Sequence, residues 1–212
     1  MKIVKSVPFF AYTQDNTHCY QSVLKMILKY FEPDKEYSYE ELDILSGKVP
    51  GKWTWDTRAI INMKKMAFQV LAMDNFDYLK FSLNARDYMN SRLGFEAAAE
   101  QEKHSDFIKE MKDAKEYYQE LGNSKKIPEI SDIKRLIREG YLVSCNINGR
   151  TLRGRDGYSG HFVLVVGFTD NTLIIHNPGT PPVSNQEVDN LLFTRAWAFP
   201  SHDRQNLTAF KK

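Results

Sequence analysis

Three residues far apart in the sequence have the types needed for a nucleophilic site: Cys19, His161 and Asn177. A cysteine attacks a carbonyl as its thiolate, so it needs a base that takes its proton and a polar group that orients the base. A histidine and an asparagine supply these two functions. Each residue also has an ordinary explanation, because cysteine is common in protein cores and histidine and asparagine often satisfy strand ends and turns. The elements that carry the three residues must decide between these interpretations.

His161 and Asn177 are expected at the same end of a β-hairpin. Two apolar runs flank the turn-forming residues 169–171, which is typical of buried strands. A three-residue turn places Asn177 opposite Val163, with His161 as a diagonal neighbour on the same face. A two-residue turn pairs Asn177 with Leu164 instead and turns it away from His161. The functional interpretation therefore requires an odd-length turn or a β-bulge.

Cys19 is expected in the first turn of a helix. Apolar residues recur at helical spacing from His18 to Phe31, and Cys19 shares the face that this helix buries. The positive end of the helix dipole favours a thiolate over a thiol. This position is therefore expected to lower the pKa of Cys19.

Length and charge limit the classes of protein to consider. The 212 residues fit a single domain, and the formal net charge of +2 gives no basic footprint for nucleic acid or an anionic membrane. The two cysteines, Cys19 and Cys145, do not make a disulfide framework, which favours a reducing compartment. No apolar run reaches membrane-spanning length, and the N-terminus lacks a signal-peptide pattern. We therefore expect a soluble, cytoplasmic protein.

Three other stretches are distinctive in composition. Residues 75–126 contain no proline, and their apolar side chains keep helical spacing among many charges, which predicts a helical insertion or lid with a solvated face. Trp53 and Trp55 either line a cleft or anchor the core. Residues 149–160 are rich in glycine and contain three arginines. They form either a mobile loop that holds a carboxylate-bearing substrate group or a solvated connection.

Four blocks that bracket nearly the whole chain carry a resemblance to a known family. They are VPFFAYTQDNTHCYQSVLKMILKYF, IKRLIREGYLVSCNIN, GHFVLVVGF and LIIHNPG. They resemble the bacteriocin-processing double-glycine peptidases and their stand-alone relatives in the papain-like superfamily. The resemblance implies an α+β fold in which a helical half carries the nucleophile and packs on an antiparallel sheet that carries the histidine and the asparagine.

The resemblance also assigns roles to four residues. It makes Cys19 the nucleophile, His161 the general base and Asn177 the orienting residue, and it makes Gln14 the side-chain donor to the oxyanion. The separation of Cys19 and His161, 142 residues, lies within the roughly 130 to 150 typical of papain-like enzymes. Gln14 stands one residue nearer to Cys19 than is usual in the family, Tyr20 replaces the usual glycine, and Asn177 replaces a more common aspartate. Asparagine has the same orienting role in papain.

Together these observations predict a cysteine peptidase that cleaves a peptide or protein substrate through a Cys19 thioester and uses no cofactor. Two alternatives stay open: an acyl transferase or amidase with the same triad, and an inactive module that binds peptides. A metal site is not expected, because the sequence shows no paired ligand spacing among His18, Cys19, His161 and His176. The sequence leaves the substrate preference and the oligomeric state open.

Overall fold

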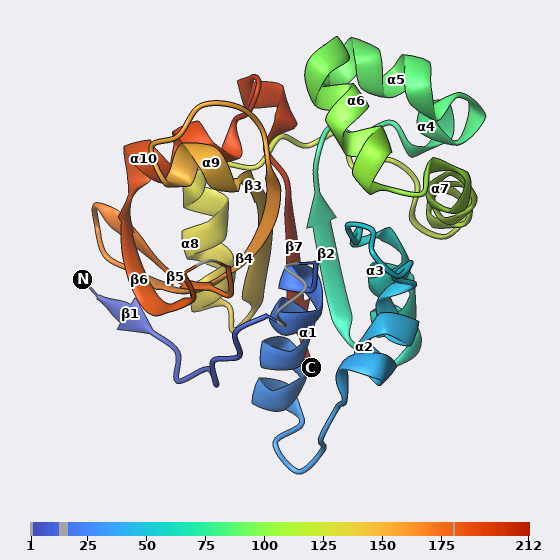
Figure 1. Ribbon diagram of the computed structural model, residues 1–212. Helices are drawn as coiled ribbons and strands as arrows, with labels where there is room; N and C mark the ends of the chain where they lie inside the picture. The colour runs from blue at the N-terminus through green and yellow to red at the C-terminus, as the bar shows by residue number, and fades with distance from the viewer. Residues whose placement is uncertain (1, 13–16, 180) are drawn as a thin grey trace.

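The computed structural model describes residues 2–12, 17–179 and 181–212, and these residues form an antiparallel sheet surrounded by helices (Figure 1). The strands lie in the order β2, β7, β3, β4, β5, β6, and β1 pairs with the end of β4. Their bounds are β1 (Ile3–Val4), β2 (Gln69–Met73), β3 (Leu142–Asn148), β4 (Gly160–Phe168), β5 (Thr172–Asn177), β6 (Val183–Asp189) and β7 (Leu207–Lys211). The expected α+β fold with an antiparallel sheet is confirmed.

Helices pack on both faces of this sheet (Figure 1). One face is covered by α1 (Cys19–Phe31), and the other by α8 (Ile130–Arg138) and α10 (Asn190–Trp197). The remaining helices are α2 (Tyr39–Ser46), α3 (Thr57–Lys65), α4 (Tyr78–Leu83), α5 (Ala85–Leu93), α6 (Phe95–His104), α7 (Phe107–Leu121), α9 (Gly149–Leu152) and the 3-10 helix η1 (His202–Arg204). Each helix within the described ranges is too short or too polar to span a lipid bilayer.

The two covered faces explain why the central strands are apolar without interruption. Successive side chains of a strand point to opposite faces of its sheet. Leu142 and Leu164 pack in the core beside α1, whereas Val143 and Val163 pack in the core beside α8 and α10. Both faces of β3 and β4 are therefore buried, which removes the polar alternation of a half-exposed strand.

The helix expected over residues 18–31 is present as α1. Its face toward the sheet is fully buried, including Val23, Leu24 and Ile27. Lys29 lies in the last turn, where a positive charge complements the negative end of the helix dipole. This packing fixes the first residue of α1, Cys19, beside the sheet.

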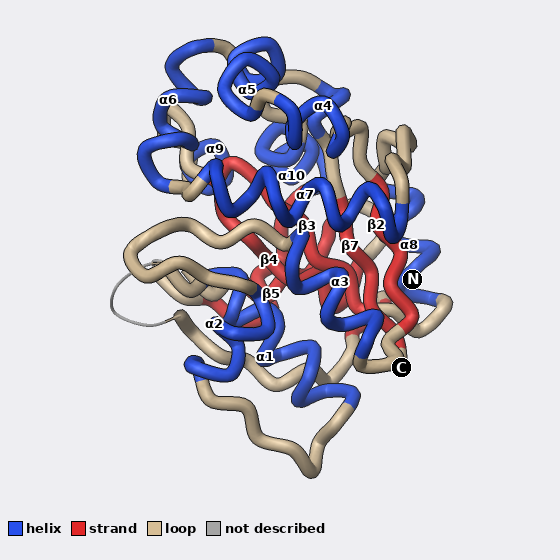
Figure 2. The backbone as a smooth tube through the Cα atoms, turned by 90° about the vertical axis from the view of Figure 1, so that its right-hand side faces the viewer, coloured by secondary structure: helices blue, strands red, loops and turns tan. Residues whose placement is uncertain are grey.

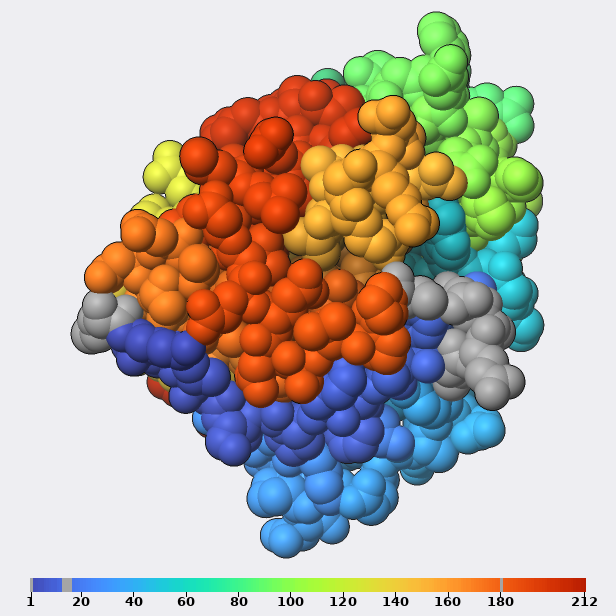
Figure 3. Space-filling view, turned by 60° about the vertical axis from the view of Figure 1, so that its left-hand side comes forward, coloured from blue at the N-terminus to red at the C-terminus, as the bar shows by residue number. Residues whose placement is uncertain are grey.

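Strand β1 attaches the N-terminal segment to β4 at a glycine. Ile3 and Val4 pair with the last two residues of β4. A side chain at Gly167 would place its Cβ 2.3 Å from the carbonyl oxygen of Ile3, so this close approach requires glycine. The backbone N–H of Lys5 also donates to the carbonyl of Val166 over 2.8 Å. Figure 3 shows the N-terminal segment, in dark blue, lying beside the orange surface of the β4–β6 region.

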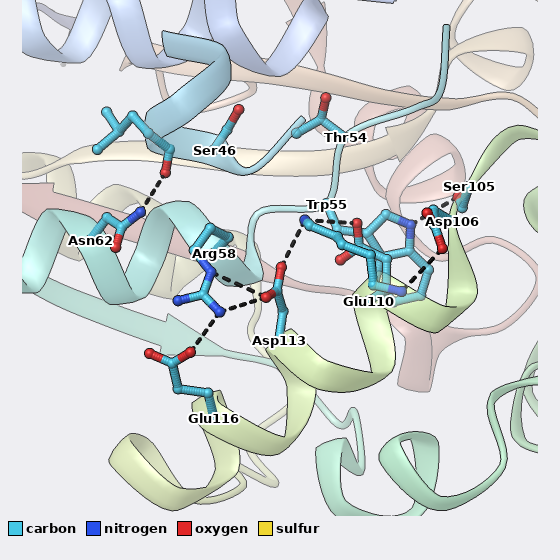
Figure 4. Close-up of polar contacts among 12 residues, drawn as sticks. Ser46, Thr54, Trp55, Arg58, Asn62, Ser105, Asp106, Glu110, Asp113 and Glu116 are labelled. Carbon is cyan, nitrogen blue, oxygen red and sulfur yellow. Dashed lines mark hydrogen bonds and ion pairs between the residues drawn. The ribbon is translucent and has the colours of Figure 1, made fainter. Parts of the chain in front are cut away.

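Residues 75–126 contain α4 to α7, which pack with α3 around a hydrophobic cluster of their own. Figure 2 shows α4, α5 and α6 gathered at one end of the molecule. Charged side chains join α7 to α3 (Figure 4). The Arg58 guanidinium of α3 pairs with Asp113 and, over 2.6 Å, with Glu116. Lys109 also pairs with Asp113 over 2.7 Å, so this buried carboxylate has two cationic partners.

We expect Arg58→Met to destabilise the protein by about 1–3 kcal/mol, because Asp113 is buried and loses a charged hydrogen-bond partner. Denaturant unfolding measures this free energy, and hydrogen exchange should show the loss of protection concentrated in α7. The matched control is Arg86→Met, since the ion pair of Arg86 with Glu102 is more exposed and should contribute little to stability. Equal destabilisation by the two substitutions would contradict this account of α7.

Candidate active site

The turn between β4 and β5, taken alone, would point the Asn177 side chain away from His161. It is a two-residue turn, because the N–H of Thr169 donates to the carbonyl of Thr172 over 2.9 Å. The pairing of Phe168 with Leu173 follows from this turn. If that register continued along the hairpin, Asn177 would face away from His161.

A β-bulge at Val166 reverses this outcome. The register shifts between Gly167 and Val165, so that Val165 pairs with Ile175. The extra residue in β4 moves every later position of β5 to the other face. Asn177 therefore shares a face with His161, and the sequence-based requirement for an odd turn or a bulge is met by the bulge.

His161 donates a hydrogen bond to Asn177, and the neighbouring contacts fix this direction. The His161 Nε2 atom lies 2.8 Å from the Asn177 Oδ1 atom. The backbone N–H of Gly179, which is always a donor, also points to this oxygen over 3.1 Å. The Asn177 Nδ2 group donates to Gln186 Oε1 over 3.1 Å. Because Asn177 Oδ1 is an acceptor, the neutral His161 ring carries its proton on Nε2 and leaves Nδ1 as a base.

The His161 ring is enclosed on several sides. A Cβ added at Gly179 would lie 2.7 Å from the Cε1 atom of His161, and one added at Gly149 would lie 3.1 Å from its Cβ. The Tyr12 ring meets it edge-on, with ring centroids 6.4 Å apart. Burial lowers the pKa of His161 to about 4, against the opposing effect of the Asn177 hydrogen bond, and the positive charge of Arg153 lowers it further. The ring is therefore neutral at pH 7.

Cys19 is the first residue of α1 and lines the same cavity as His161. Burial raises the pKa of its thiol, while hydrogen bonds from the backbone of Phe162 and Tyr20 and the charge of Lys48 act in the opposite direction. The expected lowering of the Cys19 pKa is thus wrong in sign: the helix N-terminus contributes as expected, but burial outweighs it. The contact with Phe162 places the thiol at the start of β4, next to His161 in sequence.

The remaining candidate catalytic or metal-binding residues that the structure describes do not line this cavity, and Gln14 lies outside the described residues. Tyr20 is fully buried, with its ring 4.5 Å from the Phe162 ring, so this departure from the family pattern fills the core between α1 and β4. His176 binds the carbonyl of Val7 and the N–H of Asn185 and does not face the cavity.

His18 contacts Asp43 of α2 over 3.3 Å, and Cys145 is buried in the core on the α8 side. Among the described residues, no three His, Cys, Asp or Glu side chains are arranged to hold a metal ion.

A cavity of about 220 Å³ extends from Cys19 and His161 toward α5 and α6. Trp53 and Trp55 both line it, which favours the cleft interpretation of these residues. Of the three arginines in the loop 149–160, Arg153 lines it. In Figure 3 the gold loop after α9 lies beside the green helices. The hydroxyl of Tyr158 in this loop contacts the Gln101 Oε1 atom of α6 over 3.2 Å.

Sequence reasoning missed several residues that shape this site. Gln186 and Gly179 hold the Asn177 amide, but neither residue has a distinctive spacing from Cys19 or His161. Asp56 and Asp74 also line the cavity and come from segments that showed no catalytic pattern. The position of Asp56 beside Trp55 was the one available signal.

Comparisons with known proteins bear on the family and the fold. Residues 4–199 match the model of the Peptidase C39-like family. The fold is similar to that of a C39-like peptidase from Bacillus anthracis, with a TM-score of 0.60 and 12% identity over 100% of this chain and 98% of that one. The peptidase domain of Streptococcus ComA, a bifunctional ABC transporter of a quorum-sensing pathway, has a TM-score of 0.48 and 14% identity over 96% of this chain and 95% of its own. A comparison with curated protein sequences gave no match.

Nitrogen-15 NMR of the imidazole rings should show His161 protonated on Nε2 and titrating near pH 4. Because the unfolded chain takes up this proton near pH 6.5, the folded state loses stability as the pH falls from about 6.5 to 4. A His161→Phe variant identifies the resonances and lacks this part of the pH dependence. A midpoint near 6.5, or a proton on Nδ1, would contradict the described site.

Proposed function

This chain belongs to the Peptidase C39-like family, and from that premise we propose that it hydrolyses peptide bonds as a cysteine peptidase. In the proposal Cys19 is the nucleophile, His161 the general base and Asn177 the residue that orients the base. The observation that carries it is the hydrogen bond of His161 Nε2 to an asparagine oxygen that Gly179 also binds. This bond leaves Nδ1 unprotonated in the cavity that Cys19 lines.

The proposed reaction begins from a neutral pair. Burial raises the pKa of the Cys19 thiol and lowers that of His161, so both groups are uncharged in the free enzyme. His161 Nδ1 takes the thiol proton as the sulfur attacks the substrate carbonyl, and the resulting imidazolium is stabilised by Asn177. The imidazolium then protonates the leaving amine.

The charge on the substrate oxygen needs donors that point to it before the reaction starts. In the proposal these are the backbone N–H of Cys19 and the side-chain amide of Gln14. Water, deprotonated by His161, then attacks the thioester and releases the acid product and the free Cys19 thiol.

Replacement of the nucleophile is the direct test of this function. We expect Cys19→Ala to reduce hydrolysis of an internally quenched octapeptide library by at least about 1,000-fold, because no other group forms the thioester. Circular dichroism checks the fold. Cys145→Ala is the matched control and should keep activity, since Cys145 is buried in the core on the α8 side. Undiminished hydrolysis by Cys19→Ala would refute the proposal, and amide products in the presence of added amines would indicate acyl transfer.

Gln186 should act as a positioning residue through Asn177. Gln186→Leu removes the acceptor of the Asn177 Nδ2 group, and we expect kcat to fall about tenfold with little change in KM. Gln186→Glu keeps an acceptor oxygen and should keep most of the activity. If the leucine variant retained full kcat, or the glutamate variant lost as much as the leucine variant, Gln186 would have no such role.

A further inference from the structure

The cavity beside Cys19 contains a carboxylate that lacks a cationic partner. Asp56 precedes α3 and lines the cavity. Its Oδ2 atom accepts a hydrogen bond of 3.0 Å from the hydroxyl of Thr208. No lysine or arginine of the described residues forms an ion pair with it. Burial, with a smaller contribution from the nearby charge of Asp74, raises the pKa of Asp56 to about 6 against the opposing effect of the Thr208 hydrogen bond.

The arginines that line the same cavity act on other groups. Arg204 pairs with Asp203 over 3.1 Å. Burial raises the pKa of Asp74, and the charge of Arg92 acts in the opposite direction. The Nη1 atom of Arg92 also donates to the carbonyl of Asn75 over 2.7 Å. Arg153 lies near His161 and lowers the pKa of that ring. Asp56 is therefore a cavity carboxylate whose negative charge a bound ligand can neutralise.

The walls near Asp56 suit a long cationic side chain. Trp53 and Trp55 line the cavity beside Asp56. The Trp55 ring is held in place, because its Nε1 atom donates to Ser105 Oγ over 3.0 Å and its ring packs 5.0 Å from that of Phe81. Aromatic faces bind both the methylene stem and the charged head of lysine and arginine.

We propose that Asp56, with these aromatic walls, forms a subsite that takes a lysine or arginine side chain of the peptide substrate. The inference rests on the proposed peptidase function, since it assigns a specificity to the same cavity. Residues of α5 and α6 also line the cavity, so in this proposal the helical segment 75–126 contributes to the selectivity.

The test compares charged and uncharged side chains of similar length in the internally quenched octapeptide library, with lysine, arginine or norleucine fixed at one position at a time. We expect the wild type to cleave the lysine or arginine pool at least about tenfold faster than the norleucine pool at one position. Asp56→Asn keeps the shape of the side chain and removes its charge, and it should abolish this preference. Thr208→Val removes the hydroxyl but keeps the charge, and it should retain the preference.

Asp203→Asn is the matched control. This substitution removes one negative charge close to the cavity residue Arg204. Because Asp203 itself does not line the cavity, the variant should keep the preference for lysine or arginine. Hydrolysis of the library without a preference for cations, a preference for acidic residues, or a preference that survives Asp56→Asn would overturn the inference while leaving the proposed function intact.

If the wild type cleaves no member of the library, the proposed function fails, and binding decides the inference separately. The probes are Nα-acetyl-lysine N-methylamide and its norleucine counterpart, titrated against the protein by NMR. Saturable shifts of the Trp55 indole N–H with the lysine probe alone, lost in Asp56→Asn, would support the subsite. Equal shifts with both probes, or shifts kept in Asp56→Asn, would overturn it.

Discussion

The hydrogen bond between His161 and Asn177 exists because β4 has one residue more than the part of β5 that it faces. In a regular antiparallel hairpin the two-residue turn would bring Asn177 to the opposite face. The bulge at Val166 changes the face of every residue beyond it. It does so within strands that are buried on both sides, where an alternative register would misplace a whole row of core side chains. The core that specifies the bulge therefore also specifies the pairing of His161 with Asn177.

Burial then decides the charge state of the site. The helix N-terminus and the backbone donors near Cys19 favour a thiolate, but the loss of water around the thiol has the larger effect. The same loss of water keeps His161 neutral, and Asn177, unlike aspartate, adds no negative charge that would offset it. In the proposed mechanism the proton therefore stays on the sulfur until a substrate binds, which distinguishes this arrangement from a preformed thiolate–imidazolium pair.

Some of these features were accessible from the sequence, and the reason differs from one feature to the next. The helix that carries Cys19 follows from apolar spacing, and the strands around His161 follow from their composition, because both patterns report burial directly. Turn length and bulge position do not follow, since residues 169–171 permit either register and Val166 looks like any other residue of an apolar run. The full lining of the cavity was also beyond reach, because Trp55 and the end of α6 meet only through tertiary contacts. The direction of the Cys19 pKa was predicted wrongly, because the sequence pattern indicates burial at that residue but not that burial outweighs the helix N-terminus.

Residues 3–5 bind the backbone of β4 at the bulge. The carbonyl of Val166 accepts its hydrogen bond from Lys5, and β1 lies against Gly167 beside it. These contacts join residues separated by more than 160 positions, and contacts at such separation form late in folding. During synthesis the first strand and Cys19 emerge long before the hairpin that completes them. A chain synthesised only as far as α1 therefore carries Cys19 without His161, and the site is assembled only when residues 3–5 meet residues 166–168.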